Sequence, residues 1–363
     1  GHGQAVIALA GDRSGHRVAT LGADQTVRLW AVADAPPLSR DHRAEGARVR
    51  AVAFSPDGRW LAGGGTDGLL RLWRRGSDRP PRALPGHEAG IWALAFSPSG
   101  RRLASADRAG RIRLRDPDGK GADLALEAGE AVWSLIFLDE RRLLAAADGG
   151  LHLWRLNDPE HGHRFLKHAD GRLTRMALSP DGRLLATASS DGRVALRDPA
   201  TLDLHRRFEA ARDTLWSLAF SPGGERLATA AADGSVSVWE VAEGRRLARL
   251  SGHAGGATDV TFLADGDSLV SLDRRGRLHW WDQGSRRKLT APLQAHHGAV
   301  WRLALAPDGQ TLATAGDDGL AREWDLFDPR RACELGRAAF DPVRRRQYLG
   351  AEAPRASCIQ RQR

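Results

Sequence analysis

Four tryptophans recur at one position of a repeated segment, directly after the first apolar residue of a short predicted strand. These are Trp92, Trp133, Trp216 and Trp301, and the other copies of the segment carry Ile7, Arg50, Thr174 and Thr258. An indole is large and rigid and has one hydrogen-bond donor, which suits an anchor that a binding partner contacts. The chemistry that this pattern predicts is therefore recognition.

A companion position, one residue before a recurring turn aspartate, belongs to the same predicted surface. Its occupants in chain order are Ala23, Thr66, Arg108, Ala147, Ser190, Ala232, Arg274 and Asp317. Small residues there leave room for a ligand, and the guanidinium groups of Arg50, Arg108 and Arg274 can pair with carboxylates or stack on aromatic rings. The predicted partner-binding residues are Arg50, Trp92, Trp133, Trp216, Trp301, Arg108, Arg274 and Asp317.

Catalytic and metal-binding motifs are sparse. The chain shows no glycine-rich phosphate loop followed by Lys-Ser/Thr, no His-Glu-x-x-His helix, no paired-cysteine zinc site and no nucleophile elbow. The nearest approach to a metal cluster is His161-Gly162-His163 with Asp158, Glu160 and His168 nearby, and its place in a variable loop favours solvated side chains. We therefore predict no enzyme activity, no metal and no cofactor.

The elements that must position these residues follow from an internal repeat. Eight segments, about 39 to 43 residues apart, each end in an apolar strand with an anchor residue at a fixed place. The anchors are Trp30, Trp73, Arg115, Trp154, Arg197, Trp239, Trp281 and Trp324. Within a segment, short strands alternate with turns such as Ser55-Pro56-Asp57-Gly58 and Thr66-Asp67-Gly68. This length suits one blade of four antiparallel strands.

The repeat resembles the WD-repeat (WD40) family over essentially residues 1–326. Gly-His pairs stand at 1–2, 86–87 and 252–253, and Trp-Asp pairs at 281–282 and 324–325. The resemblance implies an all-β protein, an eight-bladed β-propeller over residues 1–328, followed by a short, partly helical tail over 329–363. It also implies that partners bind on the narrow top face around the channel. The alternative interpretation is that the tryptophans only fill the channel and bind no partner.

Blades of this family are often locked by a hydrogen-bonded chain from tryptophan through Ser/Thr and His to a turn aspartate. The register supplies two complete sets, namely His2, Thr20, Asp24 and Trp30, and His296, Thr314, Asp318 and Trp324. Two repeats depart from it, since Ala109 and Arg275 stand where the aspartate is expected and Arg115 replaces one tryptophan. We expect those blades to depend on apolar packing alone and to be locally weaker.

The sequence after Trp324-Asp325 does not repeat the earlier outer-strand pattern. Asp341-Pro342 reads as a helix start, and that helix would stop near Gly350. With Cys333 and Cys358, this tail resembles the ending of bacterial WD-repeat proteins, which are frequently parts of STAND-type (NACHT or AP-ATPase) proteins or fused to kinase, protease or caspase-like effectors. The resemblance implies the sensor part of a larger bacterial signalling or defence protein. The alternative is an autoinhibitory or structural scaffold that packs against an effector or nucleotide-binding module of the same polypeptide.

Composition narrows the class of partner. The chain has 363 residues, a formal net charge of +9 and two cysteines, both in the tail, so no disulfide framework holds the body together. The basic residues are nearly all arginine and are spread along the chain, with lysine only at 120, 167 and 288, which disfavours nucleic acid as the partner. No apolar run is long enough to cross a membrane. We expect a cytoplasmic protein that binds a protein or peptide.

Overall fold

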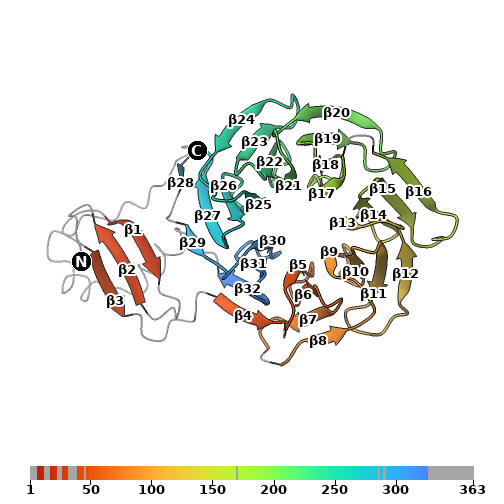
Figure 1. The fold of residues 1–363 in the computed structure, drawn as a ribbon, viewed down its shortest axis with the longest axis horizontal. Coiled ribbons are helices and arrows are strands. Elements are labelled where there is room, and N and C mark those ends of the chain that lie inside the picture. The colour runs from red at the N-terminus through yellow and green to blue at the C-terminus, as the bar shows by residue number, and fades with distance from the viewer. Residues whose placement is uncertain are drawn as a thin grey trace. The chain divides into compact units, whose positions relative to one another are not determined.

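Seven blades, six of four strands and one of five, form a closed ring in the computed structural model (Figure 1). The structure describes residues 6–11, 17–22, 27–31, 39–44, 46–77, 79–168, 171–284, 287–288 and 292–325, with side chains within 41–284 and 292–324. The chain divides into two compact units, Gly1–Arg40 with Trp324–Arg363, and Asp41–Glu323. Apart from the ends of two strands, the ring lies in the second unit.

The first three blades follow one another along the chain, each running from its inner to its outer strand. Blade 1 contains β5 (Val49–Phe54), β6 (Trp60–Gly65), β7 (Leu70–Arg74) and β8 (Arg82–Leu84). Blade 2 contains β9 (Ile91–Phe96), β10 (Leu103–Asp107), β11 (Arg111–Arg115) and β12 (Leu124–Glu127). Blade 3 contains β13 (Val132–Phe137), β14 (Arg142–Ala147), β15 (Gly150–Arg155) and β16 (His163–Lys167).

The next three blades repeat this order. Blade 4 contains β17 (Leu173–Leu178), β18 (Leu185–Ser189), β19 (Arg193–Arg197) and β20 (Leu204–Glu209). Blade 5 contains β21 (Leu215–Phe220), β22 (Arg226–Ala231), β23 (Val236–Glu240) and β24 (Arg246–Leu250). Blade 6 contains β25 (Ala257–Phe262), β26 (Ser268–Asp273) and β27 (Arg277–Asp282), and its outer edge is the two short strands β28 (Arg287–Lys288) and β29 (Leu293–Gln294).

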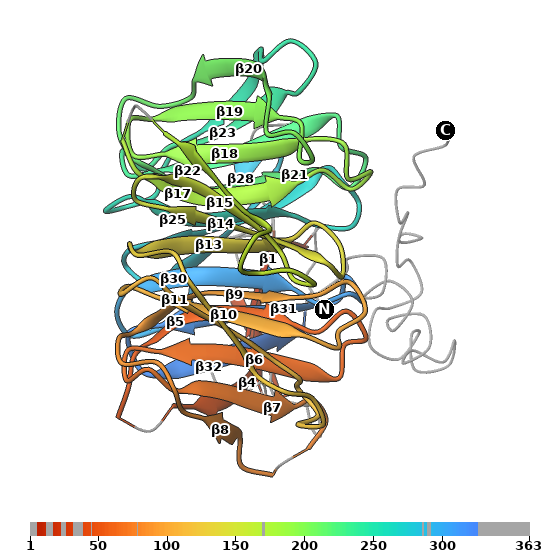
Figure 2. The ribbon, with the colours of Figure 1, turned by 90° about the vertical axis from the view of Figure 1, so that its right-hand side faces the viewer.

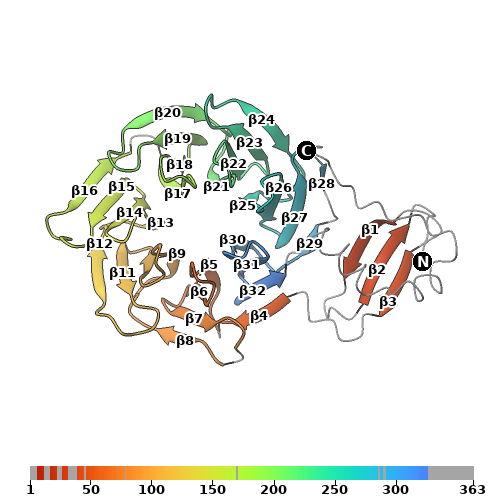
Figure 3. The ribbon, with the colours of Figure 1, turned by 180° about the vertical axis from the view of Figure 1, so that it is seen from behind.

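Blade 7 is built from two distant parts of the chain. Its inner three strands are β30 (Val300–Leu305), β31 (Thr311–Gly316) and β32 (Leu320–Asp325), and its outer strand is β4 (Ser39–Arg43). Because β30 also contacts β5, the seven inner strands close a ring around a central channel. Figure 2 shows the ring edge-on, with the strands running across its thickness, and Figure 3 shows β8, β12, β16, β20 and β24 on its rim.

The prediction of eight blades is wrong. The first repeat forms a separate sheet of three strands, β1 (Val6–Gly11), β2 (Arg17–Gly22) and β3 (Val27–Ala31). The strand that follows it in sequence, β4, pairs with β32 and completes blade 7. Once that blade has its fourth strand, the ring is closed without the first repeat. A count of repeats does not determine which sheet each strand joins.

The second strand of every blade carries the core. One leucine at the same place in each of these strands is almost fully buried, with at most 1% of its surface exposed: Leu61, Leu103, Leu143, Leu185, Leu227, Leu269 and Leu312. In β10, all five residues from Leu103 to Asp107 are buried. These strands show no polar face because neighbouring blades cover both sides of each sheet.

The Ser-Pro-Asp-Gly turns connect the first and second strands. In blade 1, the Ser55 hydroxyl donates to Asp57 (2.6 Å) and accepts from the backbone N–H of Trp60 (2.9 Å). Gly58 ends the turn with φ of +69°, a left-handed conformation that glycine adopts without strain. Ser179 and Asp181 repeat the same contact in blade 4 (2.6 Å). The local sequence therefore predicts these turns correctly.

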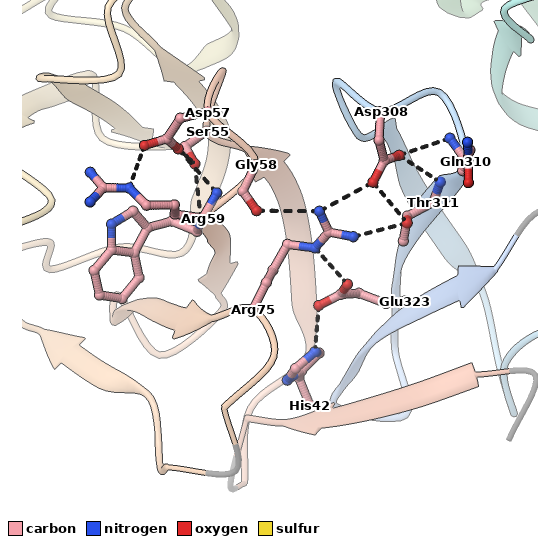
Figure 4. A network of polar contacts seen from close by, with 11 residues as sticks. His42, Ser55, Asp57, Gly58, Arg59, Arg75, Asp308, Gln310, Thr311 and Glu323 are labelled. Atoms are coloured by element: carbon pink, nitrogen blue, oxygen red, sulfur yellow. Dashed lines mark hydrogen bonds and ion pairs between the residues drawn. The ribbon is translucent and has the colours of Figure 1, made fainter. Parts of the chain in front are cut away.

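A network of charged side chains joins blade 7 to blade 1 (Figure 4). His42 of β4 contacts Glu323 of β32 (2.9 Å), and the same carboxylate pairs with Arg75 at the end of β7 (2.9 Å). Arg75 also donates to the Thr311 hydroxyl (2.9 Å) and to the Gly58 carbonyl (3.2 Å). Arg75 of blade 1 thus contacts β31 and β32 of blade 7, and it is linked to β4 through Glu323.

The predicted tail helix, Cys333 and Cys358 lie outside the described residues, as does the whole of 329–363. The described part of the chain is all β and includes no helix. It accordingly contains no helical segment with the length and apolar character needed to cross a bilayer.

Candidate functional site

A β-bulge at the start of each inner strand positions the predicted recognition residues. In blade 1, Val49 pairs with Gly65 and Ala51 with Gly64, so Arg50 has no partner in the ladder. The same skip occurs in the other six blades. The bulged residues are Arg50, Trp92, Trp133, Thr174, Trp216, Thr258 and Trp301. Bulges re-aim a side chain, and here they do so at one end of the channel.

The four indoles and four guanidinium groups at this end form one connected assembly, which we call the tryptophan–arginine mouth. Its members are Trp92, Trp133, Trp216, Trp301, Arg50, Arg108, Arg172 and Arg274. Trp92 contacts Trp133 edge-on, with ring centroids 5.1 Å apart, and lies 6.5 Å from Trp301. Residues from all seven blades therefore meet at the mouth.

Three arginines of the mouth each lie over two indole rings, and the fourth lies over one. The Arg50 guanidinium is 4.5 Å from the Trp301 ring and 5.2 Å from Trp92. Arg172 bridges Trp133 (4.6 Å) and Trp216 (5.7 Å). Arg274 bridges Trp216 (5.5 Å) and Trp301 (5.7 Å), while Arg108 lies over Trp92 alone (5.5 Å). Cation–π attraction therefore holds the cations in place where few carboxylates are present.

Two aspartates orient the indoles. Asp317 accepts the N–H of Trp301 (2.8 Å) and pairs with Arg50 (3.2 Å), and Asp148 accepts the N–H of Trp133 (2.7 Å). The indole N–H of Trp216 is buried and has no acceptor among the described residues. Burial lowers the pKa of Arg50, although Asp317 partly offsets this. Asp317 thus serves the site by holding one indole and one guanidinium.

The mouth has a packed inner part and an exposed outer part. Trp133 is 7% exposed, whereas Trp92, Trp216 and Trp301 are half-buried. Arg108 and Arg274 are exposed, and neither they nor Arg172 have a carboxylate within 4 Å among the described residues. The indoles thus form the less exposed part of the mouth, and Arg108 and Arg274 present unpaired positive charge to solvent.

Sequence reasoning missed two members of this surface. Asp148, rather than Ala147, holds the companion position of blade 3, because its N–H bonds to the Ala131 carbonyl as the N–H of Asp317 bonds to that of Ala299. The turn from β14 to β15 is one residue shorter than the corresponding turns, which displaced the register. Arg172 stands two residues before Thr174, and the same place in blade 1 is Arg48. Reading two positions earlier in every repeat would have found it.

The predicted blade locks fall partly within the described residues. His296 contacts Asp318 through Nδ1 (2.7 Å) and Thr314 through Nε2 (2.7 Å), and Trp324 is buried. His2 and Asp24 lie outside the described residues, and for Thr20 and Trp30 only the backbone is described, in β2 and β3. The structure therefore describes the polar chain of one of the two sets.

Blades 2 and 6 do not depend on apolar packing alone, so that prediction is wrong. In blade 2, His87 joins Asp107 through Nδ1 (2.8 Å) and Ser105 through Nε2 (2.8 Å). In blade 6, His253 joins Ser271 (2.7 Å), and Asp273, at the position of Asp107, contacts His279 (3.0 Å). The aspartate has moved two positions back from Ala109 and Arg275 onto the preceding strand, where it still accepts their backbone N–H groups.

The Ser105–His87–Asp107 chain has the order of a catalytic triad but not its setting. The His87 and Asp107 side chains are 0% exposed and Ser105 is fully buried, so no substrate reaches the hydroxyl. Burial lowers the pKa of His87, which keeps the imidazole neutral, with its Nδ1–H donated to Asp107. This chain stabilises the blade.

The histidines near the blade 3 loop serve separate contacts. His163 lies against His152 (3.0 Å), His161 contacts Asp158 (3.2 Å) and His168 contacts the Gly171 carbonyl (3.0 Å). Within the described part of the chain, no three His, Cys, Asp or Glu residues are grouped so as to hold a metal ion.

Two family models match the chain. The model described as "IFT122 first beta-propeller" matches residues 48–325, which is the ring, and the model described as "WD domain, G-beta repeat" matches residues 1–31. The first match leaves out the repeat that forms the separate sheet, in agreement with the seven-bladed ring.

Curated relatives share short to moderate stretches. The Protein LST8 homolog of Drosophila melanogaster is 28% identical over 53% of this chain and 50% of its own length. Eukaryotic translation initiation factor 3 subunit I of Aspergillus niger is 32% identical over 21% of this chain and 23% of its own. The probable cytosolic iron-sulfur protein assembly protein 1 of Cryptococcus neoformans is 47% identical over 14% of this chain and 10% of its own. The chain thus matches about half or less of the length of these relatives.

Proposed function

This chain belongs to the IFT122 first β-propeller family of WD-repeat propellers, and on that premise we propose that it is a non-catalytic protein-interaction propeller. Its partner is an acidic protein or peptide that docks on the tryptophan–arginine mouth. The observation that carries the proposal is the set of guanidinium groups at the mouth that have indole rings beneath them and no carboxylate beside them.

The mouth supports this role through both of its components. Rigid aromatic anchors and arginines are the residues that most often dominate the binding energy of protein interfaces. An acidic side chain that approaches Arg108 or Arg274 gains a charge-assisted hydrogen bond without displacing an existing ion pair. Asp317 limits the positive charge on the blade 7 side, where it already pairs with Arg50. The acidic groups of the partner therefore contact the blade 2 and blade 6 sides of the mouth.

Charge reversal at the exposed arginines tests the proposal. We expect Arg108→Glu combined with Arg274→Glu to weaken partner binding at least about tenfold, because two charge-assisted contacts become repulsive. Thermal stability should stay within 2 °C or so of the unmodified protein, because both side chains are exposed. The measurement is affinity capture from the source organism with quantitative mass spectrometry, followed by titration of the purified partner at rising NaCl concentration.

The matched control is Arg101→Glu. This arginine is also exposed and lies in the turn from β9 to β10, at the other end of the strands of blade 2. It should retain every partner. If the double variant retains its partners as the control does, the mouth is not the docking surface.

The wider setting of the chain stays a prediction from the sequence. The cysteine content predicts a cytoplasmic location, and the resemblance of the tail predicts a place in a larger signalling protein, with a nucleotide-binding or effector module in the same polypeptide. The three relatives named above come from a fly and two fungi, so they lend no support to a bacterial context. We therefore limit the proposal to recognition of an acidic partner.

A further inference from the structure

A charged layer lies inside the channel, directly below the mouth. The residues that follow the seven bulges are Ala51, Ala93, Ser134, Arg175, Ser217, Asp259 and Arg302. The small side chains of blades 1 to 3 leave a cavity of about 200 Å³, and Ala51, Ala93, Ser134, Arg175 and Arg302 are among its lining residues. Both arginines therefore reach the same space.

Arg302 is a buried cation without a carboxylate partner. Its side chain is about nine-tenths buried, and it reaches across the channel from blade 7 to donate to the Trp133 carbonyl of blade 3 (3.4 Å) and to the Trp301 carbonyl (3.2 Å). No carboxylate lies within 4 Å of it among the described residues. Burial and the neighbouring charge of Arg175 lower the pKa of Arg302 to about 9. Buried charges in proteins are normally paired, so this one requires an explanation.

The one carboxylate of the layer is already engaged. Asp259 is 1% exposed and accepts the backbone N–H of Leu303 (2.9 Å), the backbone N–H of Val260 (3.0 Å) and the Ser217 hydroxyl. Its contact with Arg175 is long, at 3.8 Å. Two guanidinium groups thus face one carboxylate, and the layer retains one positive charge.

We propose that Arg302 and Arg175 hold a small oxyanion of the phosphate or sulfate class in this cavity. A volume of about 200 Å³ equals about six to seven water molecules, which admits such an ion with part of its hydration. The two guanidinium groups supply donors that match tetrahedral oxygens, and Ser134 lines the same cavity. The cavity borders the mouth, because Trp92 also lines it, but the proposal does not depend on the proposed function.

Access is through the opposite end of the channel. Two positions further along each inner strand lie Ala53, Ala95, Ile136, Ala177, Ala219, Thr261 and Ala304, all of them partly exposed. Five of the seven are alanine, so small side chains line the channel on that side. This is the route to Arg302 that the proposal gives the ion.

Calorimetric titration of the full chain with sodium phosphate tests the site, with ionic strength held constant by NaCl. We expect saturable binding of one phosphate, and competition by sulfate. Arg302→Met should weaken the affinity at least about tenfold, because a charge-assisted contact is lost while the side-chain volume is kept. Arg175→Met should weaken it by a smaller factor, since Asp259 partly neutralises that guanidinium.

Asp259→Asn should change the phosphate affinity in the opposite direction. Removal of its negative charge should strengthen phosphate binding several-fold, which a purely structural role for Asp259 would not produce. Arg101→Met, an exposed arginine far from the channel layer, should bind as the unmodified protein does. Arg302→Lys, which keeps the charge, serves if the methionine variant does not fold, and it should retain part of the affinity.

Three results would overturn the proposal. The first is the absence of saturable phosphate or sulfate binding to the unmodified protein. The second is equal affinity in the Arg302 variants, which would mean an adventitious ion only. The third is weaker binding after Asp259→Asn in a folded variant. Because none of these measurements involves the acidic partner, their failure would leave the proposed function of the mouth untouched.

Discussion

His87→Leu should lower the free energy of unfolding by about 3 kcal/mol, because it leaves a buried carboxylate without the donor that neutralises it. Asp107 is 0% exposed, and its Oδ2 accepts only from His87 among the described residues, while Oδ1 accepts the backbone N–H groups of Ala109 and Arg111. Leucine fills a volume similar to that of histidine but provides no donor. The measurement is urea unfolding followed by tryptophan fluorescence at pH 7.5.

The pH dependence of this loss identifies its cause. Burial lowers the pKa of His87, so below its ordinary value of 6.5 the unfolded chain binds a proton that the folded protein does not. Stability from His87 is therefore complete above pH 6.5 and declines as the pH falls below it. The gap between the unmodified protein and His87→Leu should narrow between pH 7.5 and pH 5.5. A constant gap would mean that lost packing, rather than the polar chain, explains the effect.

The control is His161→Leu, because His161 is 83% exposed and, among the described residues, has a polar contact only with Asp158. It should change the unfolding free energy by less than about 0.5 kcal/mol. In a double-mutant cycle, Asp107→Asn should recover part of the loss caused by His87→Leu, since the unpaired charge is then absent. A fully additive double variant would contradict the contact between these two side chains.

Arg75→Met should lower the free energy of unfolding by about 2–3 kcal/mol, because the closure of the ring depends on this guanidinium. Arg75 is 20% exposed and Glu323 11%, so solvent screens their ion pair little. The substitution also removes the hydrogen bonds to Thr311 and Gly58 from the junction of blades 7 and 1. Thermal unfolding should show a lower midpoint. Limited proteolysis should cleave the variant earlier near β4, the N-terminal strand that completes blade 7.

Acid sensitivity distinguishes the ion pair from packing. Burial would raise the pKa of Glu323, but the hydrogen bonds from His42 and Arg75 outweigh it and hold that pKa below its ordinary value. Stability from the depressed carboxylate is present above about pH 4.5 and is lost as the pH falls through the folded pKa. The difference between the unmodified protein and Arg75→Met should therefore shrink below pH 4.5. Arg74→Met, the exposed neighbour on β7, should behave as the unmodified protein at every pH.

Much of the mouth was predictable because the repeat fixes register. The residue at the bulge occupies the same position in every repeat. Trp92 and Trp301 were therefore assigned to one face without knowledge of any contact. Arg108 and Arg274 followed from the companion position in the same way. The register failed at Asp148, where a turn is one residue shorter, and at Asp107, where the aspartate moved onto the strand. Both errors arise because a repeat pattern assumes equal turn lengths and equal side-chain reach.

By itself, the sequence determined the blades, their turns and most of the residues that meet at the mouth, because these depend on contacts within one repeat or between consecutive repeats. The number of blades in the ring was decided only by the tertiary structure, since β4 and β32 are far apart in the chain and their pairing leaves no trace in the repeat. The channel layer was decided there too. Arg302, Arg175 and Asp259 occupy an ordinary repeat position, and only closure of the ring brings their charges to one cavity.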